Sequence, residues 1–200
     1  MFDWQLNQPL SFVLVGVGGQ GTILASDLLA EVGMRLGYDV KQAEIHGMSQ
    51  RGGSVISNLR WASQVFSPIV PRGTADILIG FEKLEAIRFS DFLHPGGLAL
   101  VNDYAIVPVT VSSGASAYPT DAALHGSIER VTPNQCWVKG VEIAENEGNA
   151  RAMNVVMIGA LARILNLPQD VIKAAIEVRV PTKYQELNLR AFTAGWSAVI

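Results

Sequence analysis

The sequence predicts an α/β fold in which a mostly parallel sheet is covered by helices on both faces. Up to about residue 110, short apolar runs that suit buried strands alternate with apolar stripes at helical spacing. A glycine turn at residues 16–21 joins the first apolar run to the first stripe. Beyond residue 140 the apolar stripes are helical. Together these observations predict a three-layer α/β/α, Rossmann-like domain with a helical C-terminal part.

Apolar runs bounded by turn residues predict the strands. They are expected at residues 12–17, 38–45, 54–61, 76–80, 98–102, 106–111 and 135–139. Residues 95–97, Pro-Gly-Gly, are expected to form a turn because proline and glycine favour turns. The continuous apolar character of residues 76–80 and 98–102 indicates strands that are buried on both faces of a sheet.

Apolar residues three and four positions apart predict the helices. They are expected at about residues 21–36, 82–92, 120–130 and 153–164, then from near Pro168, and last as a stripe from Tyr184 that ends near Gly195. Gly37 suits a helix C-terminus, and Pro168 suits a helix start. No repeat or linker interrupts the chain, so residues 1–200 are expected to form one domain.

Composition limits the classes of function. The chain has 200 residues, a formal net charge of −3 and no lysine- or arginine-rich block, which argues against nucleic-acid binding. A mean hydropathy of +0.26 is high for a free-standing monomer and indicates that a partner covers part of the surface. The single cysteine, Cys136, excludes an internal disulfide and an iron–sulfur cluster held by this chain alone. His46, His94 and His125 lack metal-ligand spacing, so no metal site is expected.

A membrane location is not expected either. Residues 4–26 carry no charge, but glutamine, asparagine, proline and glycine interrupt their apolar run. The first residues lack the basic start of a signal peptide. A lone cysteine fits a reducing compartment, and a cytoplasmic location is therefore expected.

The glycine turn is the first candidate site. Its glycines have the G-x-G-x-x-G spacing between an apolar strand and a helix. Glycine permits a tight turn and the close approach of a ligand to backbone amides. The helix N-terminus adds free N–H groups and about half a positive charge. The candidate anion-binding residues are Gly18, Gly19, Gln20 and Gly21.

One ligand that such a turn can hold is a nicotinamide dinucleotide. Glu44 lies at about the right distance along the chain to hold its ribose hydroxyls. The next segment leads into a strand rather than a crossover helix, and no hydride-transfer residues such as a Tyr-x-x-x-Lys pair are evident. On these residues alone, a free-standing NAD(P)-binding oxidoreductase stays open as an alternative.

A second glycine-rich loop, residues 46–53, is the other candidate site. Arg51 offers a planar fork for a carboxylate or phosphate, and Ser49 and Gln50 offer neutral hydrogen bonds. Loops that leave the carboxyl ends of neighbouring strands lie side by side in an open α/β sheet. The two glycine loops are therefore expected to converge, and His46, Ser49, Gln50, Arg51 and Gly52 join the candidate site, with Arg51 as the candidate catalytic residue.

Several motifs together resemble a known family. They are V-G-V-G-G-Q-G (residues 15–21), E-I-H-G-M-S-Q-R-G-G-S-V (44–55), A-D-I-L-I-G-F-E (75–82), G-N-A-R-A-M-N-V-V-M-I-G-A (148–160) and N-L-R-A-F-T-A-G (188–195). In this order, over nearly the whole chain, they resemble the beta subunit of indolepyruvate ferredoxin oxidoreductases and, more broadly, the gamma-type domain of pyruvate and 2-ketoisovalerate ferredoxin oxidoreductases. The H-G-M-S-Q-R-G-G run favours the indolepyruvate branch.

The resemblance implies the oxidative decarboxylation of an aryl 2-oxoacid to its acyl-coenzyme A, with electrons passed to ferredoxin. It also implies thiamine diphosphate, magnesium and iron–sulfur clusters, none of which this chain is expected to bind alone. The chain has no cluster cysteines and no Gly-Asp-Gly sequence that opens a thiamine diphosphate motif. The cofactors are therefore expected on a larger alpha subunit, with coenzyme A as co-substrate.

The expected role of this chain is thus that of a small subunit whose two glycine loops face the active site of its partner. Arg51, helped by Ser49 and Gln50, would attract the oxoacid carboxylate or a coenzyme A phosphate. A purely structural docking subunit, whose loops touch no ligand, stays open as a further alternative.

Overall fold

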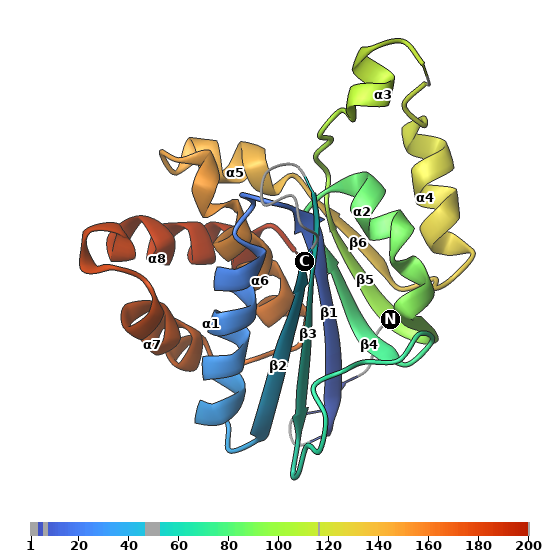
Figure 1. Cartoon of the computed structure of the whole chain (residues 1–200). Helices are drawn as coiled ribbons and strands as arrows, with labels where there is room; N and C mark the ends of the chain where they lie inside the picture. Colours follow the sequence, from blue (N-terminus) through green and yellow to red (C-terminus); the bar gives the residue numbers. More distant parts are fainter. Residues whose placement is uncertain (1–3, 6–7, 47–52, 116, 200) are drawn as a thin grey trace.

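The fold is built on one six-stranded sheet with the order β2-β3-β1-β4-β5-β6 (Figure 1). The computed structural model describes residues 4–5, 8–46, 53–115 and 117–199. The strands are β1 (Leu10–Val17), β2 (Asp39–His46), β3 (Ser54–Ala62), β4 (Ala75–Gly80), β5 (Leu93–Asn102) and β6 (Gln135–Val138). β1, β4, β5 and β6 are parallel to one another, and β3 is antiparallel to both of its neighbours, β1 and β2. Among the described strands only β3 runs against the rest, so the mostly parallel sheet is confirmed.

Helices cover both faces of this sheet, as the α/β/α prediction requires (Figure 1). One face carries α1 (Thr22–Arg35), α5 (Gly140–Asn146), α6 (Met153–Ile164), α7 (Gln169–Arg179) and α8 (Thr182–Ser197). The other face carries α2 (Lys83–Arg88) and α4 (Asp121–Glu129). A short helix, α3 (Val109–Ser112), stands away from the sheet, and 3-10 turns lie at Ser90–Phe92 and Ala150–Ala152.

Strand β1 shows how the sequence produces two cores. Phe12 and Leu14 point into the larger core with α1, α6 and α8, whereas Val13 and Val15 point into the smaller core with α2 and α4. All four side chains are fully buried. Because successive strand residues face opposite sides, an unbroken apolar run is what a strand between two helical layers needs.

Helices α6 and α8 cross very closely in the larger core. A Cβ on Gly159 would lie 2.2 Å from the Phe192 carbonyl oxygen, and one on Gly195 would lie 2.0 Å from the Val156 carbonyl oxygen. Such contacts are too short for any side chain. Two facing glycines therefore set how near the last helix lies to the core helix.

Two predicted elements are wrong. Pro95–Gly97 does not form a turn but lies within β5, opposite an irregular register of β4. A side chain at residue 97 would clash with the neighbouring strand, because a Cβ there would lie 2.9 Å from the Asp76 carbonyl oxygen. Glycine at this position therefore permits the path of β5. The freed Gly97 carbonyl accepts a hydrogen bond from the Thr132 hydroxyl at 2.6 Å.

Residues 106–111 do not form a strand either. Both sides of β5 are already paired, with β4 and β6, so no place beside it is left. Pro108 lacks an N–H and instead accepts hydrogen bonds from Val111 and Ser112 at the start of α3. The predicted helix over residues 82–92 is also shorter, since α2 ends at Arg88 and a 3-10 turn follows.

Candidate functional site

The glycine turn lies at the carboxyl edge of the sheet, between β1 and α1. Gly19 and Gly21 have φ angles of +100° and +77°, in the left-handed region that favours glycine. Gly21 is the N-cap of α1 and leaves its first turn without a side-chain cap. The sequence therefore placed this turn correctly, and the N-terminus of α1 carries free N–H groups.

The Gln20 side chain braces the turn from inside. Its Oε1 accepts a hydrogen bond from the Val17 N–H at 2.8 Å, and its Nε2 donates to the Phe81 carbonyl at 2.9 Å. Buried Asn102 donates to the same carbonyl at 2.9 Å and accepts from the Gly140 N–H at 2.9 Å. Both ends of the Gln20 amide are thus used within the protein, so its side chain shapes the turn.

Two of the nominated backbone amides are also used within the protein. The Gly18 N–H donates to the Gly53 carbonyl at 3.0 Å, and the Gln20 N–H donates to the Val17 carbonyl at 3.2 Å. Among the described residues, the N–H groups of Gly19, Gly21 and the first turn of α1 have no hydrogen-bond partner. These groups are what the turn can offer to an anion.

The second glycine loop begins and ends beside this turn. β2 ends at His46, which is paired with Val55 of β3, and β3 starts at Ser54, which is paired with Val17 of β1. The bond from Gly18 to Gly53 joins the two loops directly. The candidate residues Ser49, Gln50, Arg51 and Gly52 lie outside the described residues, as does the side chain of His46.

The strand order bears on the dinucleotide alternative. β3 lies between β1 and β2, and Ser57 pairs with Leu14 on one side and with Glu44 on the other. Glu44 is therefore one full strand farther from the glycine turn than the ribose-binding acid of a dinucleotide fold, where that strand is the immediate neighbour. This geometry disfavours a free-standing NAD(P) enzyme.

A residue that the sequence analysis did not single out, Arg151, lies next to the turn. It is exposed and lines a cavity of about 170 Å³ together with Gly19, Gln20 and Tyr104. It also lines a second cavity, of about 190 Å³, beside Asn154. Its guanidinium has no partner among the described residues, so the site has a free cation at its rim.

Asn154 ties this segment to the glycine turn. Its side chain, on a residue 2% exposed, donates to the Gly21 carbonyl at 3.1 Å. A Cβ on Gly21 would lie 2.3 Å from that nitrogen, so only glycine fits here. The signal that could have found both residues was the N-A-R-A-M-N run at residues 149–154, which the resemblance contained without a role.

A buried charged cluster lies along the same edge, where β4 ends. The Glu82 carboxylate, on a residue 1% exposed, caps α2 and accepts hydrogen bonds from the Ile106 N–H at 3.2 Å and the Tyr118 hydroxyl at 3.0 Å. Burial and the negative charge of Glu82 raise the pKa of Tyr118. The phenol therefore stays protonated and acts as a donor.

Lys83 completes the cluster. Its ammonium lies 2.6 Å from Asp103 and 2.8 Å from Asp121. Burial by itself lowers the pKa of Lys83, but the hydrogen bonds to the two carboxylates raise it overall. The Lys83 ammonium thus bridges two carboxylates, and the cluster fixes both ends of the segment that carries α3.

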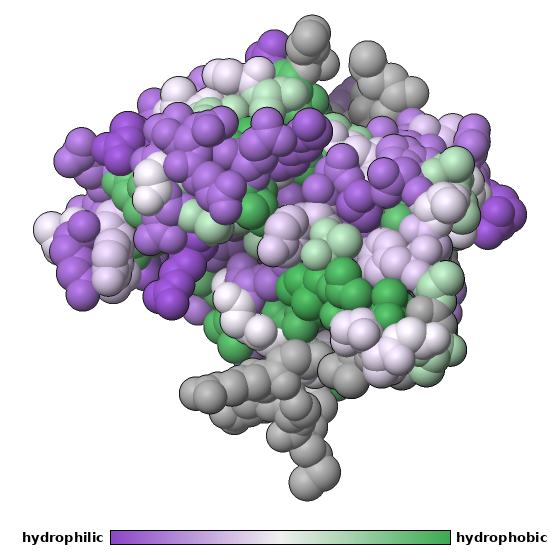
Figure 2. All heavy atoms as spheres, turned by 90° about the horizontal axis from the view of Figure 1, so that it is seen from above, coloured by the Kyte–Doolittle hydropathy of each residue, from purple (hydrophilic) through white to green (hydrophobic). Residues whose placement is uncertain are grey.

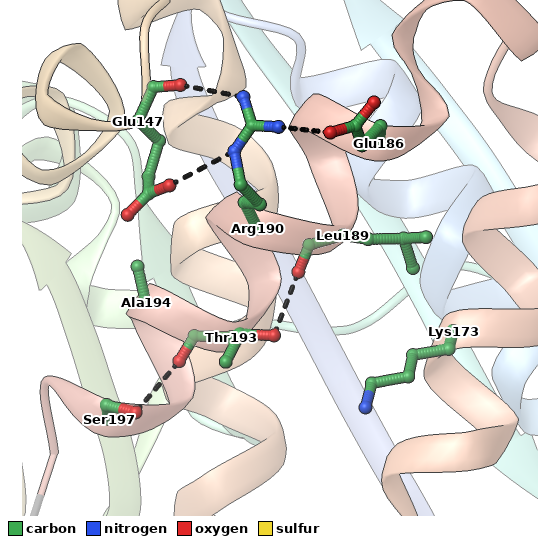
Figure 3. Close-up of a pocket in the computed structure, with 8 residues that line it drawn as sticks. All are labelled: Glu147, Lys173, Glu186, Leu189, Arg190, Thr193, Ala194 and Ser197. Carbon is green, nitrogen blue, oxygen red and sulfur yellow. Dashed lines mark hydrogen bonds and ion pairs between the residues drawn. The ribbon is translucent and has the colours of Figure 1, made fainter.

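A cavity of about 510 Å³ lies on the helical face between α7 and α8 (Figure 3). Arg190 there pairs with Glu186 at 3.0 Å and Glu147 at 3.4 Å, and donates to the Glu147 carbonyl at the end of α5. None of its lining residues lines the two cavities beside the glycine turn. Its arginine holds helices together, so this cavity is not the candidate site.

The described residues do not favour metal binding or a reactive thiol. No group of three or more His, Cys, Asp or Glu side chains there could hold a metal ion. Burial raises the pKa of the Cys136 thiol, which disfavours the thiolate that nucleophiles and metal ligands need. Across the same residues, no helix combines the length and apolar character of a membrane span.

The fold and the site define an α/β protein with a glycine turn at the carboxyl edge of its sheet. Residues 11–198 match the family model of pyruvate ferredoxin/flavodoxin oxidoreductases. The chain is 38% identical over 193 residues to indolepyruvate oxidoreductase subunit IorB of Archaeoglobus fulgidus, covering 96% of both chains. It is 40% identical over 191 residues to IorB of Thermococcus kodakarensis, covering 94% of this chain and 95% of that one.

A solved structure shares the fold. The 2-oxoglutarate:ferredoxin oxidoreductase of Magnetococcus marinus matches with a TM-score of 0.73 at 20% identity, over 96% of this chain and 31% of that chain. The chain thus belongs to the pyruvate ferredoxin/flavodoxin oxidoreductase family. It is homologous to the small subunits of 2-oxoacid:ferredoxin oxidoreductases, which confirms the resemblance drawn from its motifs.

Proposed function

We propose that this chain is the small subunit of an aryl-2-oxoacid ferredoxin oxidoreductase, with indolepyruvate as the first substrate to test. The observation that carries the proposal is the identity of 38% and 40% to two IorB subunits along nearly the whole chain. In the proposed reaction, the 2-oxoacid loses carbon dioxide, its acyl group joins the coenzyme A thiol, and the released electron pair reduces ferredoxin. The whole chain, residues 1–200, acts as one domain in the cytoplasm.

The cofactors belong to a larger partner subunit in this proposal. Cys136 is the one cysteine of the chain, and its raised pKa does not suit a cluster ligand. When bound by the partner, thiamine diphosphate supplies the nucleophilic carbon for decarboxylation. The small subunit contributes shape and charge at the rim of that site, and it is inactive alone.

The glycine turn and the second loop form that rim. The free N–H groups of Gly19, Gly21 and the first turn of α1 favour an anion, and the positive end of α1 adds to the attraction. Arg51, with Ser49 and Gln50, adds a cationic fork from the second loop, which starts at His46 and includes Gly52. Arg151 adds a second cation beside Gly19. The anion is the oxoacid carboxylate or a coenzyme A phosphate.

The function is tested by expressing the chain with and without its larger partner. The complex is assayed with indolepyruvate, phenylpyruvate, hydroxyphenylpyruvate and pyruvate, with coenzyme A and ferredoxin present. We expect activity from the complex alone, with a preference for the aryl substrates. An active complex that prefers pyruvate would contradict the substrate assignment, and no activity with any oxoacid would contradict the function.

The site is tested with Arg51→Ala and Arg151→Ala in that complex. Loss of a charge-assisted hydrogen bond to an anion costs about 1.5–3 kcal/mol, which corresponds to roughly a tenfold or larger loss in kcat/KM. A change in KM for one substrate alone identifies the anion that the arginine meets. Arg72→Ala, an exposed arginine at the opposite edge that pairs with Asp91, is the control and should leave the kinetics unchanged. Unchanged kinetics in both site variants would contradict the proposed site.

A further inference from the structure

We propose that Arg88 is a positioning residue, which holds the end of the second glycine loop against the glycine turn through Ser54. This inference rests on the proposed function, because that function assigns the glycine turn to an anionic substrate. It deepens that function by naming a residue outside the site on which the placement of the free amides depends.

The Arg88 guanidinium joins two elements that lie far apart in the sequence. Its Nη1 donates to the Ser54 hydroxyl at 2.9 Å and lies 2.9 Å from the Glu85 carboxylate. Arg88 is the last residue of α2, and Ser54 is the first residue of β3. α2 follows β4 and so begins at the carboxyl edge of the sheet. Because long side chains of a helix point back toward its N-terminus, the arginine reaches the edge at which the second loop ends.

A buried carboxylate fixes the direction of this arginine. The Glu85 side chain is 7% exposed, and its Oε1 pairs with Arg88. Its Oε2 is buried and has no hydrogen-bond partner in the described part of the chain. A buried carboxylate without a counter-charge is strongly unfavourable, so Glu85 depends on the guanidinium. The pair therefore keeps the guanidinium in one place, where it also meets Ser54.

Ser54 passes this constraint to the glycine turn through the backbone. Its neighbour Gly53 accepts a hydrogen bond from the Gly18 N–H at 3.0 Å. Gly52 and Gly53 come directly before Ser54 in the sequence. Because glycine has the greatest backbone freedom, Ser54 carries the first side chain that can anchor this end of the loop. The Gly19 N–H, one of the free amides, belongs to the residue after Gly18.

The glycine turn is thus held from two directions. Gln20 joins it to Val17 and Phe81, and Arg88 holds the strand end that receives the Gly18 N–H. Phe81 comes shortly before α2 begins, and Arg88 ends it. The placement of α2 therefore determines both contacts.

The bond between Arg88 and Ser54 matters for position more than for stability. It is exposed, and the Arg88 side chain is 57% exposed. Figure 2, which looks down on the carboxyl edge, shows hydrophilic side chains around a smaller hydrophobic area. Water competes for an exposed hydrogen bond of this kind, so its loss changes stability little. A small displacement of a binding group, by contrast, can weaken catalysis strongly.

The experiment uses the assembled complex with Ser54→Ala, Arg88→Ala and both changes together. KM and kcat are measured for the oxoacid and for coenzyme A, and thermal unfolding is followed for each chain. Ser54→Ala leaves the pair of Glu85 and Arg88 intact, so it tests the contact even if loss of the arginine destabilises the fold. Arg130→Ala is the matched control, since this exposed arginine also donates to a serine hydroxyl, that of Ser127, at 2.9 Å at the end of α4.

We expect Ser54→Ala and Arg88→Ala each to raise the KM of one anionic substrate by roughly two- to tenfold, the range that one hydrogen bond is worth. The KM of the other substrate, kcat and the melting temperature of Ser54→Ala should stay unchanged. The double variant should be no worse than Arg88→Ala, because both changes remove the same contact. Arg88→Lys keeps a donor and a charge and should restore most of the affinity, and Arg130→Ala should behave like the wild type.

A wild-type KM in both single variants, or two effects that simply add, would overturn the positioning role, while an active wild-type complex leaves the proposed function intact. Weaker binding of Arg88→Ala to the larger subunit, with Ser54→Ala unaffected, would assign Arg88 to the subunit interface and overturn the role as well. A wild-type complex without activity on any oxoacid would overturn the proposed function, and this inference with it.

Discussion

Gln20 shows that a motif residue can serve the site without meeting a ligand. The G-G-Q-G run nominates the backbone amide of Gln20 as a group that faces an anion. In the structure the side chain instead joins the end of β1 to the segment after β4, through Val17 and Phe81. The glutamine has the length and the two-ended amide that this bridge needs. It therefore positions the neighbouring glycines.

The replacement Gln20→Ala should destabilise the isolated chain by about 1–3 kcal/mol, because the Val17 N–H and the Phe81 carbonyl each lose a part-buried partner. The free energy of unfolding is measured with urea. Gln42→Ala is the control, since its hydrogen bond to Asp27 is exposed and its loss should cost about 0.5 kcal/mol or less. Equal free energies of unfolding for the two variants would show that the Gln20 side chain does not stabilise the turn.

At the scale of elements, the crossing of α6 and α8 depends on two glycines. Gly195 lies against the Val156 carbonyl, and Gly159 lies against the Phe192 carbonyl. A side chain at either position would push the helices apart. A search for apolar stripes does not find these two glycines, because glycine has no side chain that could mark a buried face.

The replacement Gly195→Ala should destabilise the fold by about 1–3 kcal/mol through overpacking. Gly126→Ala in α4 is the matched control, because a Cβ there meets nothing within 4 Å. Alanine at that half-buried but uncrowded helical position should be neutral or stabilise by up to about 1 kcal/mol. Thermal unfolding of both variants tests the pair, and equal melting temperatures would contradict a close crossing.

Most elements could be predicted from the sequence, because the pattern of apolar residues records which faces are buried. β1, β4 and the helices of the C-terminal part follow this rule. Residues 95–97 and 106–111 did not, since their structure depends on distant neighbours. Gly97 lies within a strand because Thr132 satisfies its carbonyl, and residues 106–111 leave the sheet because β6 already occupies the edge of β5.

The candidate site was predictable to a similar degree. The convergence of the two glycine loops was predicted from the carboxyl ends of their strands, and the bond between Gly18 and Gly53 agrees with it. Arg151 was missed, because it belongs to a segment far along the chain, which the hydrogen bond from Asn154 to Gly21 holds beside the turn. Arg51 remains a prediction, since it lies outside the described residues.

At the scale of the whole molecule, the strand order separates this fold from a dinucleotide-binding enzyme. β3 takes the place next to β1 that the second parallel strand has in such enzymes. Glu44 is thereby removed from the glycine turn. What is left at the carboxyl edge is a rim of backbone amides beside the exposed Arg151.

The isolated chain should therefore not bind NAD or NADP at micromolar concentrations. Titration calorimetry measures this directly, with a nicotinamide-dependent dehydrogenase as the positive control. Micromolar binding of either cofactor, reduced by Glu44→Ala, would restore the dinucleotide alternative.

The antiparallel placement of β3 has one more consequence. Because β2 and β3 are consecutive and antiparallel, no crossover connection is needed between them. β3 pairs along nearly its whole length with β1 on one side and with β2 on the other. This pairing sets the register of β3, whatever the length of the segment that connects it to β2. The sequence between β2 and β3 can therefore vary in length and composition without changing the strand order of the sheet.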